Sequence, residues 1–399
     1  MHHLLLVAGV LCALPAWAAP LHLEQGAAST GLAGSATARV TGPGSIFHNP
    51  AAAADIAGVA VEIGGAVVVP HHQVHTRQRG KPVLEMVTGR WRTSLQPQTP
   101  PAVFATARIR DLALAVGVFS PLVQSVHWPA QWPGRTQAIT VDVKPLTINP
   151  MLAYRIHAIR VGMGITLTGA WADESRVIQS AGVERTLRLQ GPGAGLGFNA
   201  GLLFLPAEMV RVGVQYRSRT LMGFRQMATF SGGDALAACD AGSPCLRDQP
   251  SFADVTLPDV MNVGLAWRAF PATEVSVDGN LVIWSVDSRR ARKFETAQTA
   301  LPALPHTVRD TVGLRGAVEQ GLIFVAPDLK LRAGVLVEGS PVSHVSATAD
   351  APWGDRLGAS IGLGWRIFGV TLAAAYLSLI HISEPTRLRR ISYAVFCLK

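Results

Sequence analysis

The sequence has no long hydrophobic run after its first residues, and it carries little charge. Beyond residue 18 it contains no apolar run of the roughly 18 residues that a transmembrane helix needs. Charged residues make up 15% of the chain and hydrophobic residues 49%. The mean hydropathy of +0.28 is high for a soluble secreted protein. Such a chain has either a large α/β core or a membrane barrel, in which apolar residues occupy every second position.

Clustered basic residues are also lacking. The formal net charge is +9, and the tail from residue 378 contributes +3 of it, which leaves +6 for residues 19–377. Because these charges are scattered along the chain, a nucleic acid is not indicated as a partner.

The first 18 residues resemble a secretory signal peptide. An apolar run over residues 4–14 precedes Ala16, Trp17 and Ala18, a cleavage pattern that places the mature start at Ala19. The segment before the apolar run has no Lys or Arg, which departs from the usual signal. The sequence therefore predicts an exported protein.

Cysteine is scarce, and two of the four cysteines lie in the predicted signal and in the tail. The other two, Cys239 and Cys245, enclose a turn-rich loop. In an oxidising compartment this spacing predicts a local disulfide. A metal site is the weaker alternative, because no His or second Cys pair lies nearby.

Most of the remaining chain alternates at the period of a β-strand. In the first clear window, Met163 and Trp171 belong to an apolar face, and Gly162 and Thr168 belong to a small or polar face. Short turns separate some strands and long Pro-rich connections separate others, as in membrane barrels. The clearest windows are residues 159–171, 210–217, 329–338 and 357–367.

The second face of these strands is rich in glycine. Glycine packs nothing and is normally depleted in strands, so this face predicts that some object approaches the wall closely. A plug inside a barrel would be such an object, with the apolar face turned to lipid. Trp171, Tyr216 and Trp365, near strand ends, suit interfacial aromatic girdles. The alternative is a soluble β-sandwich with aromatic residues at its rim.

A small-sided segment, residues 31–38, lies between the signal and the first strand, and the motif Asn49, Pro50, Ala51 follows it. It is too small-sided to form a core and too apolar for a solvated tail. In this context it resembles the N-terminal hatch of the long-chain fatty acid outer-membrane transporter family (FadL/TodX type).

Two later stretches carry the same resemblance. Residues 257–267 and 278–284 are similar to the family's Leu-Pro strand start and the Trp-containing strand that follows. Pro352, with Asp355 and the Gly-rich residues 360–364, is similar to a late strand of the family. Together these places cover most of residues 24–376.

The resemblance implies an all-β fold: a transmembrane antiparallel β-barrel of about 14 strands, with an N-terminal hatch plugging the lumen. Residues 19–58 would form the hatch and residues 59–377 the barrel. It implies uptake of long-chain fatty acids or aromatic hydrocarbons across the outer membrane of a Gram-negative bacterium. Outer loops would capture the substrate, the hatch would gate it, and release would be lateral into lipid. A monomer without a cofactor is expected.

The hatch and gating residues implied by the resemblance are Ser45, Phe47, Asn49, Pro50 and Ala51. Proline fixes φ and lacks a donor, which suits a turn in a packed lumen, and asparagine bonds the local backbone. The alternative is a purely structural turn.

Substrate-binding candidates lie on the strands and in one loop. Arg155, Arg268 and Arg315, together with Arg332 and Arg366, are expected to face the lumen. A lumen arginine could hold a carboxylate, and the alternative is pairing with acids of the lumen or plug.

The loop at residues 127–133 is a second candidate. Its Trp128 and Trp132 could form an exposed hydrophobic landing site, and the alternative is interfacial anchoring.

Signals for an enzyme or a metal centre are poor. Residues 358–362 match the Gly-x-Ser-x-Gly sequence pattern of a nucleophile elbow. They lie in an alternating strand, however, rather than at a strand-to-helix turn. His71, His72 and His75 have no Asp, Glu or Cys partners nearby in sequence. We therefore expect neither catalysis nor a metal. The open alternatives to a hydrophobic channel are a structural or adhesive barrel, a lipid hydrolase and a diffusion porin.

Residues 378–399 differ from the family pattern. They resemble translated adapter sequence, so the native pattern is expected to stop near Tyr376 and the closing strand to be missing. A barrel left open in lipid would expose an unpaired strand edge.

Overall fold

The computed structural model describes residues 21–22, 24–70, 72–76, 89–180, 183–232, 247–286, 293–294, 309–342, 354–382 and 388–398. The predicted signal peptide, residues 1–18, and the predicted disulfide of Cys239 and Cys245 lie outside these ranges. Both stay predictions. Among the described residues, no helix is long and apolar enough to cross a membrane.

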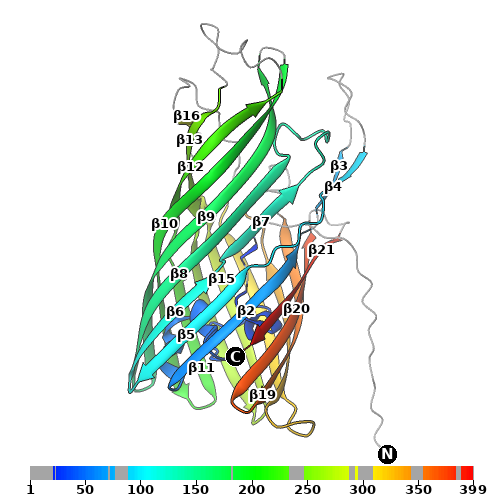
Figure 1. Cartoon of the computed structure of the whole chain (residues 1–399). Helices are drawn as coiled ribbons and strands as arrows, with labels where there is room; N and C mark the ends of the chain where they lie inside the picture. Colours follow the sequence, from blue (N-terminus) through cyan, green and yellow to red (C-terminus); the bar gives the residue numbers. More distant parts are fainter. Residues whose placement is uncertain are drawn as a thin grey trace, which may run out of the picture.

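The strands form a tall barrel and are tilted relative to its axis (Figure 1). Neighbouring strands pair antiparallel, as expected from the short connections between them. The wall strands are β2 (Val59–Val69), β5 (Pro101–Ile109), β6 (Leu112–Phe119), β8 (Thr140–Ile156), β9 (Ile159–Ser180), β10 (Val183–Ala207), β11 (Val210–Arg217), β12 (Thr220–Ser231), β13 (Gln249–Leu257), β14 (Asp259–Phe270), β15 (Thr273–Ile283), β17 (Thr311–Gly321), β18 (Leu329–Glu338), β19 (Asp355–Ile367), β20 (Val370–Ile382) and β21 (Leu388–Leu398).

Shorter elements complete the wall and its outer end. The strand β7 (Leu122–His127) continues the direction of β6 after an interruption and pairs with β8. The short strands are β1 (Leu21–His22), β3 (Gln73–Thr76), β4 (Gly89–Arg92) and β16 (Lys293–Phe294), and the short helix η3 (Trp284–Val286) follows β15. The long strands β9 and β10 rise above the others at the end of the barrel opposite the tight turns (Figure 1).

The ring of strands is closed where we expected it to be open. Strand β20 continues to Ile382, past Tyr376, and β21 pairs with β20 on one side and with β2 on the other. The expected gap is therefore bridged by residues of the predicted foreign tail. That residues 378–399 are foreign to the gene stays a prediction, and residues 383–387 lie outside the described ranges.

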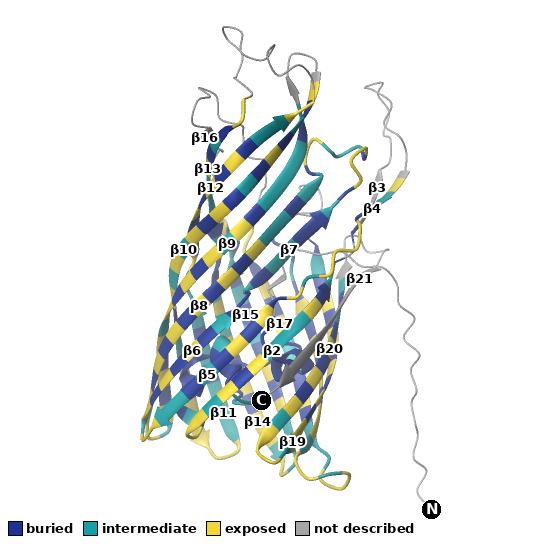
Figure 2. Cartoon of the chain, in the orientation of Figure 1, coloured by how far each residue is buried: buried dark blue, intermediate teal, exposed yellow. Residues whose placement is uncertain are grey.

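The two faces of the wall are as different as the alternation predicted (Figure 2). On β9, Met163 is 66% exposed on the outer face, whereas Thr166 is 3% exposed on the inner face. Trp171 and Trp365 are exposed on the outside, as expected for residues that face lipid. Tyr216 is half-buried instead and donates its hydroxyl to Asp259 over 2.6 Å.

The lumen is filled by the chain's own N-terminal residues 24–56, called the luminal segment below (dark blue inside the barrel, Figure 1). It contains α1 (Ala27–Gly31), α2 (Ser45–His48) and the 3-10 helix η1 (Pro50–Asp55). Nearly all of its residues are buried. The small side chains of this segment therefore pack against the wall rather than forming a core of their own.

Glycines of the wall allow the luminal segment to approach. A Cβ atom added at Gly162 would lie 2.5 Å from the Ala51 nitrogen, and one added at Gly334 would lie 2.5 Å from the Leu32 carbonyl carbon. Real Cβ contacts are not this short, so only glycine fits. This confirms that the Gly-rich face marks close contact. The same holds for Gly201 against Asn49 and for Gly213 against Thr37.

We expect Gly162→Ala to lower the free energy of unfolding by about 1–3 kcal/mol, because the added methyl overpacks the contact with Pro50 and Ala51. Gly169→Ala on the same strand is the control. It lies on the outer face, and no described atom lies within 4 Å of an added Cβ there. Its effect should stay within about 0.5 kcal/mol. Urea unfolding in detergent measures both, and equal effects would contradict the close packing.

Candidate functional site

The motif Asn49, Pro50, Ala51 is a helix start held against the wall. The Asn49 side chain accepts a hydrogen bond from the Ala51 nitrogen over 3.1 Å, which caps η1, and Pro50 occupies the first position of that helix. The Asn49 amide group donates to the carbonyls of Thr37 and Leu202, both over 3.0 Å. One side chain therefore joins two parts of the luminal segment to β10.

A buried carboxylate anchors the middle of the luminal segment. Asp278 on β15 is 2% exposed. It accepts hydrogen bonds from the Ser35 hydroxyl at 2.9 Å, the Ala36 nitrogen at 3.1 Å and the Thr37 nitrogen at 2.8 Å. It thereby satisfies backbone donors that no regular structure satisfies here.

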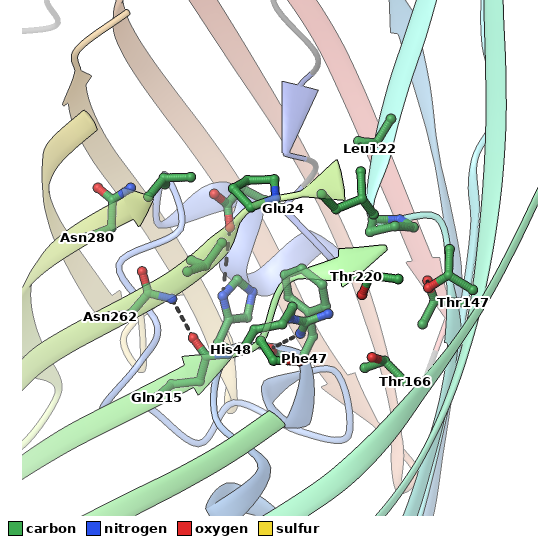
Figure 3. A pocket seen from close by; sticks show the side chains of 18 of the residues that line it. Glu24, Phe47, His48, Leu122, Thr147, Thr166, Gln215, Thr220, Asn262 and Asn280 are labelled. Carbon is green, nitrogen blue, oxygen red and sulfur yellow. Dashed lines mark hydrogen bonds and ion pairs between the residues drawn. The ribbon is translucent and has the colours of Figure 1, made fainter. Parts of the chain in front are cut away.

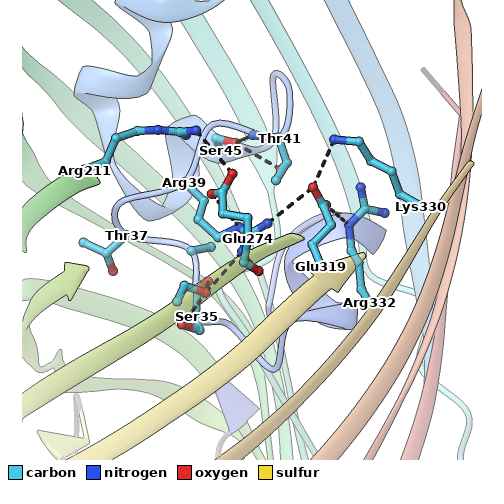
Figure 4. Close-up of polar contacts among 12 residues, drawn as sticks. Ser35, Thr37, Arg39, Thr41, Ser45, Arg211, Glu274, Glu319, Lys330 and Arg332 are labelled. Carbon is cyan, nitrogen blue, oxygen red and sulfur yellow. Dashed lines mark hydrogen bonds and ion pairs between the residues drawn. The ribbon is translucent and has the colours of Figure 1, made fainter. Parts of the chain in front are cut away.

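A second anchor is the buried Arg39, which points between two wall carboxylates (Figure 4). Its guanidinium lies 3.5 Å from Glu274 and 3.4 Å from Glu319. Glu319 also pairs with Arg332 over 2.6 Å and with Lys330 over 3.0 Å. Losing one member would leave an uncompensated buried charge, so this network fixes where the segment sits.

A third network joins the start of the segment to β17, β18 and β19. Arg315 lies 2.5 Å from Glu24 and 4.0 Å from Glu338, and Glu338 lies 2.8 Å from Arg356. Two carboxylates thus balance two guanidinium groups. The predicted binding residue Arg315 therefore pairs with an acid of the luminal segment, which was the alternative for it.

A cavity lies above the luminal segment (Figure 3). Its empty space is about 860 Å³, including the part open to solvent. Glu24, Phe47 and His48 form its floor, and polar side chains such as Thr147, Thr166, Gln215 and Thr220 project into it from the strands (Figure 3). Apolar residues line it as well: Leu122, Leu257, Pro258, Val260 and Val282.

Arg217, at the end of β11, also lines this cavity. Its guanidinium donates to the Phe47 carbonyl over 2.9 Å. It lies 4.5 Å above the Phe47 ring and 5.4 Å from the Phe119 ring. Such cation–π contacts hold the group over the aromatic faces. Arg217 was not among the predicted binding residues, although the alternation of residues 210–217 placed it on the inner face.

The cavity lies against an interruption of the wall. Strand β6 ends at Phe119 and β7 begins at Leu122, with Ser120 and Pro121 between them. Residues 147–154 of β8 pair with β6 and residues 140–143 pair with β7. Among the described residues, no strand pairs with residues 144–146 on this side.

Side chains bridge this interruption. The Ser120 hydroxyl donates to the Pro145 carbonyl over 2.8 Å. Gln25 of the luminal segment donates to the Ser120 carbonyl, also over 2.8 Å. The luminal segment thus touches the wall where its ladder is broken.

The predicted site residues fall in different places. Phe47 faces the cavity, and the buried Ser45 accepts a hydrogen bond from the Thr41 nitrogen over 2.8 Å (Figure 4). Arg155 pairs with Asp111 over 2.9 Å near the turn between β5 and β6. Arg268 is exposed near the end of β14. Neither Arg155 nor Arg268 lines the cavity, because both lie too close to the strand ends.

The expectation of exposed aromatic residues in the loop at 127–133 is wrong. Trp128 and Trp132 are 4% and 3% exposed, stack with ring centroids 4.4 Å apart, and pack with Trp91. The Trp132 indole donates to the Ala138 carbonyl over 2.7 Å. They form the small core of the outer loops instead. Sequence alone does not show that a loop folds back on itself.

The weak enzyme and metal signals find no support in the described residues. Residues 358–362 lie within the regular strand β19. The described part of the chain contains no group of three His, Cys, Asp or Glu side chains placed to hold a metal ion. His71 lies outside the described ranges.

A closed antiparallel barrel with an apolar outer face and a filled lumen belongs to the class of outer-membrane barrels. Residues 9–381 match the family described as outer membrane protein transport protein (OMPP1/FadL/TodX). The chain belongs to this family, whose members carry hydrophobic compounds across the outer membrane of Gram-negative bacteria. The match ends close to the start of the predicted foreign tail.

Solved structures of this family share the fold. A Pseudomonas aeruginosa FadL homologue is 16% identical with a TM-score of 0.79, over 96% of this chain and 98% of that one. The toluene transporters TodX of P. putida and TbuX of Ralstonia pickettii are each 15% identical, with TM-scores of 0.72 and 0.70. These two alignments cover 94% of this chain and 97% and 98% of theirs. No curated protein sequence matches the chain.

His48 makes the packing of the luminal segment sensitive to acid. Burial lowers the pKa of its imidazole to about 3, and the nearby charge of Arg315 acts in the same direction. The packed ring is therefore neutral. An unpacked imidazole titrates near pH 6.5, so the packed state loses stability as the pH falls below about 6.5, by up to about 1.4 kcal/mol per pH unit.

We expect the wild type to lose about 2 kcal/mol more stability than His48→Gln between pH 6.5 and pH 5.0. The variant removes the titrating group and keeps a polar side chain of similar size. Urea unfolding of both proteins at the two pH values measures the difference. The same pH dependence in both proteins would show that His48 does not carry the effect.

Proposed function

We propose that the chain takes up long-chain fatty acids or aromatic hydrocarbons by a route with three steps. Outer loops capture the substrate, displacement of the luminal segment gates it, and it leaves sideways through the wall. The observation that carries this proposal is the meeting of three features at one place: the cavity, the luminal segment and the interruption between β6 and β7.

The contacts of the luminal segment support its role as the gate. Its floor residues Glu24, Phe47 and His48 bound the cavity from below, and the networks of Arg39 and Asp278 hold it beneath. A segment that fills the lumen blocks straight passage. A shift of its upper part breaks contacts such as that of Gln25 with Ser120 and that of Glu24 with Arg315.

The surroundings of the interruption support lateral release. A hydrophobic molecule gains nothing from an aqueous exit, whereas the lipid outside the wall removes it from water. An apolar groove on the outer face is lined by Leu146, Ile148 and Leu167. It includes part of residues 144–146, which pair with β9 but not with β6 or β7. Thr168 lines both this groove and the inner cavity. The outer groove and the inner cavity therefore lie on opposite sides of the same part of the wall.

A cross-link between the luminal segment and the wall tests the gate. The Ser35 hydroxyl of the luminal segment lies 3.0 Å from the Ser276 hydroxyl of β15, so the variants Ser35→Cys and Ser276→Cys place two thiols side by side for a disulfide. With Cys397 replaced by serine, we expect oxidation to abolish uptake of labelled oleate and toluene in a strain lacking its own transporter, and reduction to restore it.

The controls are the two single cysteine variants under the same oxidation. The fraction of cross-linked protein is read from its mobility on a gel. Uptake that continues in fully cross-linked protein would show that the luminal segment does not need to move.

Repair of the broken ladder tests lateral release. In the double variant Ser120→Thr, Pro121→Val, both positions can pair in a strand, because valine supplies the backbone donor that proline lacks. We expect β6 and β7 to merge and uptake to fall to the level of the empty strain. Pro250→Val on β13, away from the cavity, is the control and should transport normally. Normal uptake by the double variant would favour an axial exit.

A further inference from the structure

The groove on the lipid-facing side of the wall extends across β8, β9, β10 and β12. Its empty space is about 1510 Å³, including the part open to the surroundings. Leu146, Ile148 and Leu196 line it, and each is at least 43% exposed on the outer face. Among the described residues that line the groove, Lys144 alone is charged. The groove therefore has an apolar body and a cationic end.

Small residues form the floor of this groove. Gly169 pairs with Leu146 on one side and with Ala194 on the other, and Ala194 pairs with Gly223. These residues are exposed on the outer face, and no described atom lies within 4 Å of a Cβ added at Gly169. The next row of paired outer residues has larger side chains: Ile148, Leu167, Leu196 and Leu221. The floor is therefore recessed, and a hydrocarbon chain can lie on it.

The cationic end lies at the outer boundary of the lipid-facing band. On β8, every second residue from Leu146 to Leu152 is exposed and apolar, and Lys144 is the first charged residue above them (Figure 2). The tight turn after β8 belongs to the periplasmic end, and a strand crosses the hydrocarbon layer with about 9–11 residues. Trp171, which pairs with Lys144 and is 51% exposed, is typical of such a boundary. Lys144 consequently lies near the head groups of the outward-facing leaflet.

A second cation stands along the same edge of the groove. Trp171 pairs with Pro192, and the register of β10 with β12 places Arg225 beside Pro192. Both Lys144 and Arg225 are exposed. Because neighbouring strands lie about 4.8 Å apart, the two cations are separated by roughly 14 Å across the wall. The edge therefore presents positive charge at two separate points.

The acids near this edge have other partners. Asp142 accepts a hydrogen bond from the Ser125 hydroxyl over 2.6 Å, and Asp173 pairs with Arg188 over 2.8 Å. Asp254, opposite Gly223 on β13, also has a contact of its own. Among the described residues, no carboxylate forms an ion pair with Lys144 or Arg225. Both cations are therefore available to an anionic group from outside the chain.

We propose that this groove binds lipid A, the phosphorylated glycolipid of the outer leaflet, with acyl chains on the Gly169 floor and phosphates at Lys144 and Arg225. Lipid A carries a phosphate at each end of its sugar head group, which matches two separated cations, whereas phosphatidylglycerol carries one phosphate. Cation–phosphate contacts are charge-assisted and strong for their kind. A floor that crosses several strands accepts more than one acyl chain. The proposal goes beyond transport, because it concerns the outside of the wall.

Lipid binding to the purified full chain in detergent tests this assignment. The probes are diphosphorylated lipid A, the same lipid with both phosphates removed, and dioleoylphosphatidylglycerol, and native mass spectrometry measures their dissociation constants. We expect the wild type to bind diphosphorylated lipid A about tenfold or more tightly than the other two. The double variant Lys144→Gln, Arg225→Gln should bind the phosphorylated and the dephosphorylated lipid within about threefold of each other.

Two further variants complete the test. Gly169→Leu fills the floor and should weaken both forms of lipid A about fivefold or more while the preference for phosphate stays. Its side chain points into open space, so the barrel should fold, which heat-dependent mobility on a gel checks. Arg268→Gln is the matched control, because Arg268 is an exposed arginine at the opposite end of the wall. It should change lipid A binding less than about twofold.

Three results would overturn the proposal. Equal affinity of the wild type for lipid A with and without phosphates would show that the cations do not read the head group. Phosphatidylglycerol binding as tight as that of lipid A, with the same dependence on Lys144 and Arg225, would make a phospholipid the occupant. Unchanged lipid A binding in both Gly169→Leu and the double variant would place the lipid elsewhere on the wall.

Discussion

The structure depends on one constraint: a chain segment with little regular structure is enclosed in a lumen, and its polar backbone groups must find partners there. The wall supplies these partners at fixed places. Asp278 accepts from the donors of residues 35–37, Glu62 accepts from the Gly44 nitrogen over 2.8 Å, and Ser360 donates to the Gly31 carbonyl over 2.9 Å. Side chains of the barrel wall thus supply hydrogen bonds that regular secondary structure would supply within the luminal segment.

Two kinds of contact hold the luminal segment: close packing against glycines of the wall, and buried ion pairs. At Gly162 and Gly334 the wall lets the backbone of the segment come into contact, so packing is tight and non-polar there. Around Arg39 and Glu24, ion pairs set the position. Buried ion pairs add little net stability over apolar packing, but each is lost at a high cost when its partner is removed. They specify one placement of the segment in the lumen.

The cavity gains its chemistry from where strands are interrupted. Along β8 the partner strand changes from β6 to β7, and along β10 it changes from β11 to β12. Ser120 bridges one interruption with its hydroxyl, and Arg217 with Ser218 occupies the other. The cavity and the broken ladder consequently lie side by side.

The sequence by itself determined the barrel, because a period of two repeated over many strands fixes which residues face lipid and which face inward. It also determined the close contact at the Gly-rich face. At Asn49 and Pro50 it predicted a turn bonded to the local backbone, whereas the structure has the start of a 3-10 helix there. The tertiary structure alone decided which partners the inner arginines have. Arg315 pairs with Glu24, far away in the sequence, whereas among the described residues Arg217 contacts the Phe47 carbonyl and the rings of Phe47 and Phe119 and no carboxylate. Alternation gives the face of a side chain, but its partners depend on how the luminal segment and the strand ends meet in space.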